Sequence, residues 1–418
     1  MGDDNHLCAL PAEIVVYIFS FLSARELIKC RQLSIRLKEI VDSMIQTEAL
    51  WRQHCKSEFS SIYQMARYKS KPGLLWYNIY KSLKLWSKLA YAREDLDEFA
   101  SASELSNEIS NVIILRDGLI GVHTRGGIVY YHIETLDKAK REDIRGTYLR
   151  YMENDDMIVV LSYNLQLFII RKTIQNPRFE PCVKFDNVKT FLLIDEITYY
   201  VTLSDDIYEC KREDLTSERL EHSDDGVMSL SYSRNKLHIL TFQRSIYSVN
   251  GKNLVLECTL GSDTSLLDQL SKYNFLESLD WRIYNQWMYV LNHNLPHGPL
   301  RDIIKVRMYG DVVFVGSNWG VLRIYYAPYT GEIFDLYNAE PVRQFNFIER
   351  YDCPVLSNCP IIQIDVSERE DGHTVIVAMP KKIAVLNLTH NFKRTASVAM
   401  LPYHENSKMK VLKIKDFV

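Results

Sequence analysis

Few residues in this chain have the types and spacings of a catalytic or metal-binding site. His293 and His297 are four positions apart, as two metal ligands on one helix would be, but Pro296 between them prevents that helix. We therefore interpret the pair as part of a loop. The sequence contains no phosphate-binding glycine loop, no zinc-protease motif, no nucleophile elbow and no EF-hand loop. We predict a protein that is not an enzyme and that needs no cofactor or metal.

Paired acids and scattered cysteines offer no catalytic pattern either. Asp155-Asp156 and Asp205-Asp206 fall between apolar runs, where solvated turn carboxylates are common. The eight cysteines include no C-x-x-C pair, so neither a disulfide framework nor a zinc site is indicated. The remaining candidate chemistry is recognition of another protein by apolar faces and exposed cations.

The composition is that of an ordinary globular protein. The 418 residues are 47% hydrophobic and 25% charged, with a net charge of −3, which gives no electrostatic reason to expect nucleic-acid binding. The apolar run from Ile14 to Leu22 is too short to cross a bilayer and follows acidic residues, so neither a membrane span nor a signal peptide is predicted. We expect a protein of the cytoplasm, the nucleus or both.

The first fifty or so residues are expected to form three short helices. Pro11 suits the first turn of a helix. Ile14, Ile18 and Leu22 then recur every four residues, as on one side of a helix. Val15 and Phe19 widen this stripe into one broad apolar face. Ser23, with Glu26 three positions later, indicates a capping box that begins a second helix. Three short helices over about forty residues make a poor core alone, so a partner surface is expected to cover these wide apolar faces.

These residues resemble an F-box. The resemblance covers about one eighth of the chain and runs through Leu10-Pro11-x-Glu13-Ile14, Ile18-Phe19-Ser20-Phe21-Leu22, Arg25-Glu26-Leu27, Leu33-Ser34-Ile35-Arg36-Leu37 and Leu50-Trp51. Ser34 and Leu37 depart from the pattern, where the family often has Cys and Trp. The resemblance implies that the helices dock on a Skp-family adaptor and, through it, on a cullin–RING ubiquitin ligase. The adaptor-binding residues that it implies are Leu10, Pro11, Ile14, Ile18, Phe19, Leu22, Leu27, Leu33 and Leu37.

The helical pattern continues to about Glu98. Trp51, Trp76 and Trp86 stand on apolar helical stripes, which we expect to join the helices to the next domain. The segment 92–107 is rich in Glu, Asp and Ser and is expected to be an exposed connection.

A strand-only repeat follows. The middles of successive second strands, Ile120, Val159, Tyr199 and Ile239, are 39, 40 and 40 residues apart. Less regular later units contain Trp287–Leu291, Val312–Val315 and Thr374–Val377. This period is typical of β-propeller blades of four antiparallel strands. We predict seven blades, or six if the fifth unit is an insertion. The repeats resemble WD-type propellers in outline only, because their Trp-Asp dipeptide is missing.

The predicted organisation is α-helical and all-β in separate domains. An F-box helical module spans 1–55, a helical linker spans 56–107 and the β-propeller spans 108–418. A strand near the C-terminus, Val398–Leu401 or Met409–Ile414, is expected to close the ring by pairing with the first blade or with the chain just before it.

A partner-binding helical module followed by a large propeller indicates a protein that bridges two partners. If the resemblance holds, the chain is the substrate-recognition subunit of an SCF-type ubiquitin ligase, and its propeller binds an unknown protein client. The alternative is a non-catalytic propeller scaffold that acts outside a ligase. A propeller enzyme is disfavoured because no convergent acids, histidines or metal ligands are found.

The client site is predicted on the turns between second and third strands, which share one face of a propeller. The candidate client-binding residues on these turns are Arg125, Arg244, Trp319 and Lys381. Guanidinium groups suit carboxylates and phosphates, which favours an acidic or phosphorylated client segment. The alternative is that Trp319 is wedged between blades and that the charges are merely solvated.

Overall fold

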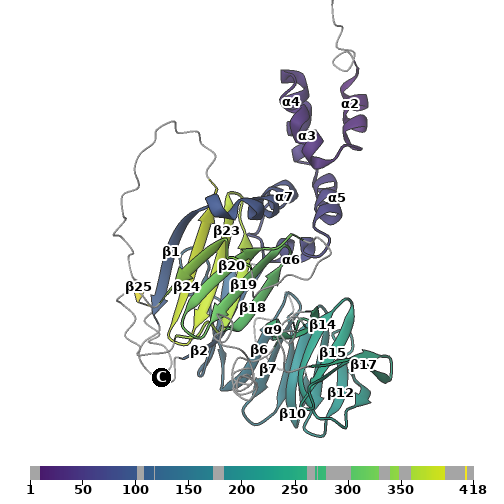
Figure 1. Ribbon diagram of the computed structural model, residues 1–418, viewed down its shortest axis with the longest axis vertical. Helices are drawn as coiled ribbons and strands as arrows, with labels where there is room; N and C mark the ends of the chain where they lie inside the picture. Colours follow the sequence, from purple (N-terminus) through teal and green to yellow (C-terminus); the bar gives the residue numbers. More distant parts are fainter. Residues whose placement is uncertain are drawn as a thin grey trace, which may run out of the picture.

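The chain folds into a group of N-terminal helices followed by a β-propeller (Figure 1). The computed structural model describes residues 10–100, 108–116, 118–172, 183–260, 269–270, 272–278, 303–328, 339–347, 359–390 and 410–411. The predicted fold class, helices and then a propeller, is confirmed.

Three short helices form the N-terminal module: α2 (Ala12–Phe19), α3 (Ala24–Cys30) and α4 (Ile35–Ile45). The capping box predicted at the start of α3 is confirmed, since the Glu26 N–H donates to Ser23 Oγ and the Ser23 N–H donates to Glu26 Oε2 at 2.9 Å. Ser34 caps α4 in the same way by accepting from the Leu37 N–H at 3.1 Å. These caps define where α3 and α4 begin.

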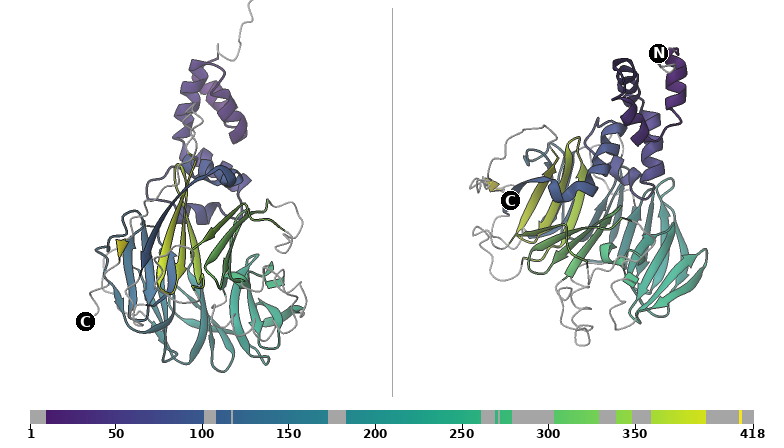
Figure 2. Two further views of the ribbon diagram at one scale, coloured as in Figure 1. Left: turned by 60° about the vertical axis from the view of Figure 1, so that its left-hand side comes forward. Right: turned by 45° about the horizontal axis from the view of Figure 1, so that its top comes forward.

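Four further elements connect this module to the propeller. They are α5 (Glu48–Glu58), α6 (Tyr63–Lys69), α7 (Trp76–Leu85) and the 3-10 helix η1 (Trp86–Tyr91). Helices α6 and α7 lie against the propeller, whereas α2, α3 and α4 project away from it (Figures 1 and 2).

The described strands form six antiparallel sheets, which we number as blades in chain order. Blade 1 comprises β2 (Ile109–Ile114), β3 (Leu119–Thr124), β4 (Gly127–His132) and β5 (Ile144–Arg145). Blade 2 comprises β6 (Tyr148–Glu153), β7 (Met157–Ser162), β8 (Leu167–Arg171) and β9 (Val183–Phe185). Blade 3 comprises β10 (Val188–Ile194), β11 (Ile197–Thr202), β12 (Asp206–Lys211) and β13 (Ser217–His222).

The second half of the propeller repeats this plan. Blade 4 comprises β14 (Val227–Ser233), β15 (Lys236–Thr241), β16 (Ser245–Asn250) and β17 (Asn253–Thr259). Blade 5 comprises β18 (Ile303–Tyr309), β19 (Val312–Ser317), β20 (Val321–Tyr326) and β21 (Arg343–Asn346). Blade 6 comprises β22 (Gln363–Glu368), β23 (Gly372–Met379), β24 (Lys382–Thr389) and β1 (Arg93–Ala100), with β25 (Lys410–Val411) at its edge.

The repeat predicted from spacing is confirmed for these six blades. Ile120, Val159, Tyr199 and Ile239 each lie in the second strand of a blade, in β3, β7, β11 and β15. The expected fifth unit at Trp287–Leu291 lies outside the described residues, as do His293 and His297. Between blades 4 and 5 the described chain includes the short helix α9 (Phe275–Ser278), which contacts both β14 and β18.

The ring is closed by β1, which corrects the predicted boundary at residue 108. Arg93–Ala100 was expected to be an exposed connection, but it pairs along its whole length with β24, from Arg93↔Thr389 to Ala100↔Lys382. Its acidic residues, Glu94-Asp95 and Asp97-Glu98, are tolerated because β1 lies on the outer side of the blade, with half-buried Leu96 packed on the core. The predicted pairing of a C-terminal strand with the chain just before the first blade is confirmed in β25, which adds to β1 in parallel at Phe99 and Ala100. Its predicted role in closing the ring is wrong, because β1 already completes blade 6.

The propeller has two faces with different neighbours. The face carrying the turns between first and second strands, here called the proximal face, meets the connecting helices: a Cβ on Gly310, in the β18–β19 turn, would lie 3.3 Å from Ile62. Antiparallel strands alternate in direction, so the turns between second and third strands lie on the opposite, distal face. The helical module and the predicted client-binding turns are therefore at opposite ends of the propeller.

Candidate partner-binding surfaces

The N-terminal module exposes large apolar side chains that no other described part of the chain covers. Tyr17 is 64% exposed, Phe21 is 72% exposed and Ile35 is 79% exposed. The rings of Tyr17 and Phe21 pack edge to face with centroids 5.0 Å apart. The full set of exposed apolar residues on the module is Ile14, Val16, Tyr17, Ile18, Phe21, Leu33 and Ile35. Such a concentration of large apolar groups marks an interaction surface.

The structure divides the nine residues predicted to bind an adaptor. Ile14, Ile18, Leu33 and Pro11 are exposed, whereas Leu10 and Leu22 are half-buried. Phe19, Leu27 and Leu37 are buried in the chain's own core, which corrects their predicted role as contact residues. Their physical role is to pack α2, α3 and α4 together, so they support the exposed surface from beneath.

Sequence reasoning missed Tyr17, Phe21 and Ile35. The signal was present, because Ile14, Tyr17, Ile18 and Phe21 follow the i, i+3, i+4, i+7 spacing of a single helical face. Val15 and Phe19 form the opposite, buried stripe. In the sequence the two stripes look like one broad apolar face. The sequence alone therefore does not show which stripe the module buries by itself.

A continuous apolar core joins this module to the propeller. The same hydrophobic cluster contains Phe19 and Leu27 from the module, Trp51 from α5 and Phe314 from blade 5. Trp51 is fully buried, and its Nε1 donates to the Met44 carbonyl at 3.1 Å. The predicted role of the tryptophans in joining the helices to the propeller is confirmed for Trp86, which packs on Phe314 with ring centroids 5.7 Å apart. Trp51 instead packs among the helices, against Tyr77 and Tyr80.

Four buried side chains form a hydrogen-bonded cluster between α7–η1 and blade 6. We call Ser82, Trp86, Glu368 and His373 the junction cluster. Trp86 Nε1 donates to Glu368 Oε1 at 3.0 Å, and His373 Nδ1 lies 2.9 Å from Glu368 Oε2. Ser82 Oγ also donates to Glu368 Oε2. The indole of Trp86 stacks on the His373 ring with centroids 3.5 Å apart.

The electrostatics of the junction cluster favour the ionised carboxylate. Burial by itself would raise the pKa of Glu368, but the charge of His373 and the hydrogen bonds from His373, Ser82 and Trp86 outweigh it, so that the pKa lies below its ordinary value. Each of the polar atoms on Glu368 thereby has a partner from another element. The cluster holds the helices to the propeller in one orientation.

A second ion pair fastens α6 to the inner strands. The Lys69 ammonium contacts the Asp365 carboxylate on β22, and Asp365 Oδ2 also accepts from the Ile114 N–H of blade 1 at 2.8 Å. Burial lowers the pKa of Lys69 to about 8, with the Asp365 carboxylate opposing that shift. One carboxylate thus connects α6, blade 6 and blade 1.

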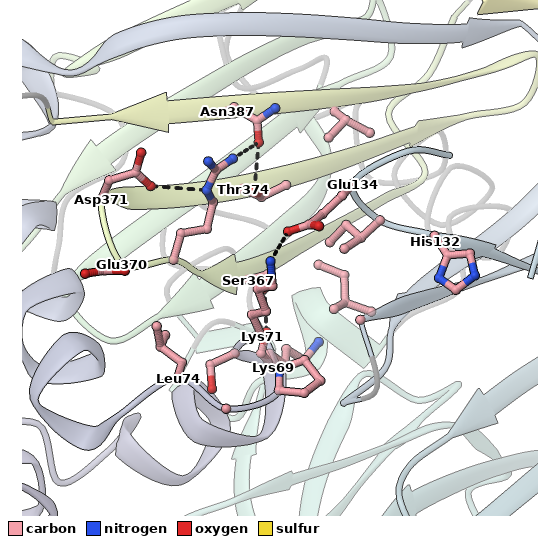
Figure 3. A pocket seen from close by; sticks show the side chains of 18 of the residues that line it. Lys69, Lys71, Leu74, His132, Glu134, Ser367, Glu370, Asp371, Thr374 and Asn387 are labelled. Atoms are coloured by element: carbon pink, nitrogen blue, oxygen red, sulfur yellow. Dashed lines mark hydrogen bonds and ion pairs between the residues drawn. The ribbon is translucent and has the colours of Figure 1, made fainter. Parts of the chain in front are cut away.

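A cavity of about 1150 Å³ lies where the α6–α7 turn meets blades 6 and 1 (Figure 3). Four of its charged side chains form two ion pairs: Lys71 Nζ lies 2.6 Å from Glu134 Oε1 (Figure 3), and Arg369 Nε lies 3.3 Å from Asp371 Oδ1. Thr374 and Arg369 both donate to the Asn387 side-chain oxygen, at 2.8 and 2.9 Å. Within the described residues, no group of three or more His, Cys, Asp or Glu is arranged to hold a metal ion.

The four residues predicted to bind a client all lie on the distal face. Arg125 is exposed in the β3–β4 turn, Arg244 is half-buried in the β15–β16 turn, and Lys381 is half-buried in the β23–β24 turn. Trp319, in the β19–β20 turn, is 47% exposed and therefore is not wedged between blades. The four turns belong to blades 4, 5, 6 and 1. Blade 6 contacts both blade 5 and blade 1, and α9 contacts both blade 4 and blade 5. All four residues thus lie on one face, and their role in client binding stays a prediction.

Comparison with known proteins bears on the helical module. Residues 7–57 match the model of the F-box-like family. The chain therefore carries an F-box-like domain followed by a β-propeller. Domains of this family typically bind Skp-family adaptors, which makes the exposed apolar residues of α2 and the α3–α4 turn the candidate adaptor-binding surface. No curated protein matches the chain.

Two solved structures are similar to the chain at low identity. One is a crystal structure of the N-terminal domain of Nup159, with a TM-score of 0.40 and 12% identity over 71% of this chain and 97% of that one. The other is an S. cerevisiae assembly of a Dbp5 variant with Nup159, a Gle1 variant, IP6 and ADP, with a TM-score of 0.40 and 9% identity over 72% and 96% of the two chains.

Among the helices described for the present chain, none is long and apolar enough to cross a bilayer.

Proposed function

We propose that this chain is the substrate-recognition subunit of an SCF-type E3 ubiquitin ligase. Its F-box-like domain would bind the Skp-family adaptor, and its propeller would bind the client protein. The single observation that carries the proposal is the exposed apolar surface on the F-box-like domain, with Tyr17 and Phe21 at its centre. In this role the chain performs no bond chemistry, as is typical of F-box proteins.

The joint between module and propeller supports this role. A receptor accelerates ubiquitin transfer by raising the client's effective concentration near a conjugating enzyme carried by other subunits. That effect requires a spacer that holds the client at a constant position, and a loose joint would dilute it. The continuous apolar core and the junction cluster supply such a joint.

Titration of a Skp-family adaptor into the full-length chain by calorimetry tests the adaptor contact. Burying one large apolar side chain is worth about 1.5–3 kcal/mol, so Tyr17→Ala combined with Phe21→Ala should weaken binding at least about tenfold. The matched control is Tyr91→Ala, because Tyr91 is 88% exposed but lies on η1, away from the module. Leu10→Ala with Pro11→Ala should also weaken binding. An adaptor affinity that is unchanged in the Tyr17/Phe21 variant contradicts the proposal.

Co-purification separates a ligase subunit from a scaffold outside a ligase. The proposal predicts that the wild-type chain retains both adaptor and cullin, and that the Tyr17/Phe21 variant loses both together. Retention of the adaptor without cullin, or of neither, favours the scaffold.

A further inference from the structure

The distal face repeats one turn geometry on four of the six described blades. In blades 2 to 5 a Ser or Thr ends the second strand, and the residue three positions later has a left-handed backbone with φ between 59° and 68°. These pairs are Ser162 with Leu165, Thr202 with Asp205, Thr241 with Arg244, and Ser317 with Gly320. A type I turn that ends in a left-handed residue is a common way to join two antiparallel strands.

Hydrogen bonds fix each of these turns. The Ser or Thr hydroxyl of blades 2, 4 and 5 accepts from a backbone N–H across the turn, from Gln166, Ser245 and Val321 at 3.2, 3.2 and 2.9 Å. In blade 3 the Thr202 hydroxyl donates to the Asp206 carbonyl at 3.4 Å. The turns therefore hold the side chains of their central residues in defined places.

An apolar side chain at the centre of each turn is exposed. Tyr163, Leu203, Phe242 and Trp319, which we call the distal strip, are 44%, 52%, 63% and 47% exposed. In blades 2, 3 and 4 the side chain follows directly after the Ser or Thr, and in blade 5 it is one position later. Single exposed apolar residues are ordinary on protein surfaces. Four of them at the centres of equivalent turns on one face of the propeller mark a candidate interaction surface.

Two members of the distal strip are additionally tied to the start of their own blades. The Leu203 N–H donates to the Asn187 carbonyl at 2.7 Å, and the Phe242 N–H donates to the Gly226 carbonyl at 3.0 Å. These backbone hydrogen bonds fix the positions of Leu203 and Phe242 before a partner binds, which lowers the entropic cost of binding.

The charges around the distal strip indicate the chemistry of its partner. No described residue forms an ion pair with Arg125, Arg244 or Lys381. Two acids of this face are paired within the chain. Asp205 contacts Lys189, and Asp206 contacts Arg219 at 2.6 Å.

Two further acids, Asp224 and Asp225, lie in the connection between β13 and β14. Asp224 is fully exposed and lies 3.4 Å from His222, and Asp225 accepts a hydrogen bond from the Tyr247 hydroxyl at 2.6 Å. On the described part of this face, Arg125, Arg244 and Lys381 therefore remain available to a partner, and they complement carboxylates.

We infer that the distal face receives a segment of another protein that combines large apolar side chains with acidic ones. The apolar side chains would rest on the distal strip, and the carboxylates would pair with Arg125, Arg244 and Lys381. This inference deepens the proposed function and rests on it, since it names the chemistry of the client at the end of the propeller opposite the adaptor. Exposed aromatic and Arg side chains are the residue types that dominate binding energy at protein interfaces.

Random peptides displayed on phage and selected against the full-length chain provide the test. Enriched peptides should combine Asp or Glu with Phe, Leu or Trp. Synthetic copies are then titrated into purified variants by fluorescence anisotropy. Phe242→Ala with Trp319→Ala should weaken binding at least about tenfold. Arg125→Ala with Arg244→Ala and Lys381→Ala should weaken binding and reduce its dependence on salt.

The matched control is Val255→Ala with Leu256→Ala, two residues that are 46% and 54% exposed on the outer strand β17 of blade 4. This variant should bind the peptides like wild type. A selection that enriches no peptide, or only basic or purely polar ones, overturns the inference, as does equal affinity for the Phe242/Trp319 variant. Adaptor titrations on the same variants separate the two proposals, because loss of peptide binding with normal adaptor binding concerns the distal face alone.

Discussion

Removing the Glu368 carboxylate should weaken the joint between the F-box-like domain and the propeller. The side chains of Glu368 and His373 are both fully buried. Deleting one partner of a buried ion pair typically costs about 3–5 kcal/mol, because the other partner is left buried and unpaired. At about 2 °C per kcal/mol for a large domain, Glu368→Ala should lower the melting temperature by roughly 6 °C or more.

The assay is thermal and urea unfolding of the full-length chain, followed by circular dichroism. The matched control is Glu370→Ala, since Glu370 is exposed and lies two positions away on the same face of the molecule. The control should melt within about 1–2 °C of wild type, because substitutions on the surface typically change stability by less than about 0.5 kcal/mol. If Glu368→Ala and Glu370→Ala melt at the same temperature, the junction cluster does not stabilise the joint.

The same carboxylate makes a prediction about pH. The pKa of Glu368 in the folded chain lies below its ordinary value of 4.5, so the unfolded chain binds the proton more tightly. Its contribution to stability is therefore complete above pH 4.5 and is lost as the pH falls through the lower, folded-state pKa. Glu368→Gln cannot ionise, so the stability difference between wild type and this variant should shrink on acidification. A difference that stays constant or grows would refute the assigned electrostatics.

Three further outcomes are expected. Deleting residues 408–418 removes, from the described part of the chain, the two-residue pairing of β25 at the outer edge of blade 6 and should lower the melting temperature by less than about 2–4 °C, whereas Leu96→Asp in the closing strand β1 should lower it further. Burial raises the pKa of Cys55 to about 12, so a thiol reagent at pH 8 should modify Cys55 only after denaturation, as mass spectrometry would show. Ser23→Ala removes the cap of α3 at a cost of about 1 kcal/mol and should speed hydrogen exchange at the Glu26 amide, while an unchanged exchange rate would contradict the capping role.

Much of the fold could be predicted from local pattern. Ser23 and Glu26 specify where α3 begins because a capping box acts over four residues. The period of about forty residues places Ile120, Val159, Tyr199 and Ile239 in equivalent strands because each blade repeats the same sequence of strands and turns. The distal position of Arg125, Arg244 and Lys381 follows from counting antiparallel strands.

The closing strand could not be found in this way. Arg93–Ala100 carries two adjacent pairs of acids and no strong strand signal, yet it pairs with β24 almost 290 residues later in the chain. Pairing over such a separation depends on which sheet edge remains open once the other strands of blade 6 have folded.

The amino-acid sequence by itself determined the helical module, the strand repeat and the face on which each turn emerges, because these depend on periods of a few residues. Only the tertiary structure decided which apolar residues remain available to a partner. Phe19 and Tyr17 are two positions apart on α2, yet one is buried and the other is 64% exposed. The reason is that burial depends on where α3 and α4 pack, and a helical stripe does not state which of its sides the neighbouring helices will cover.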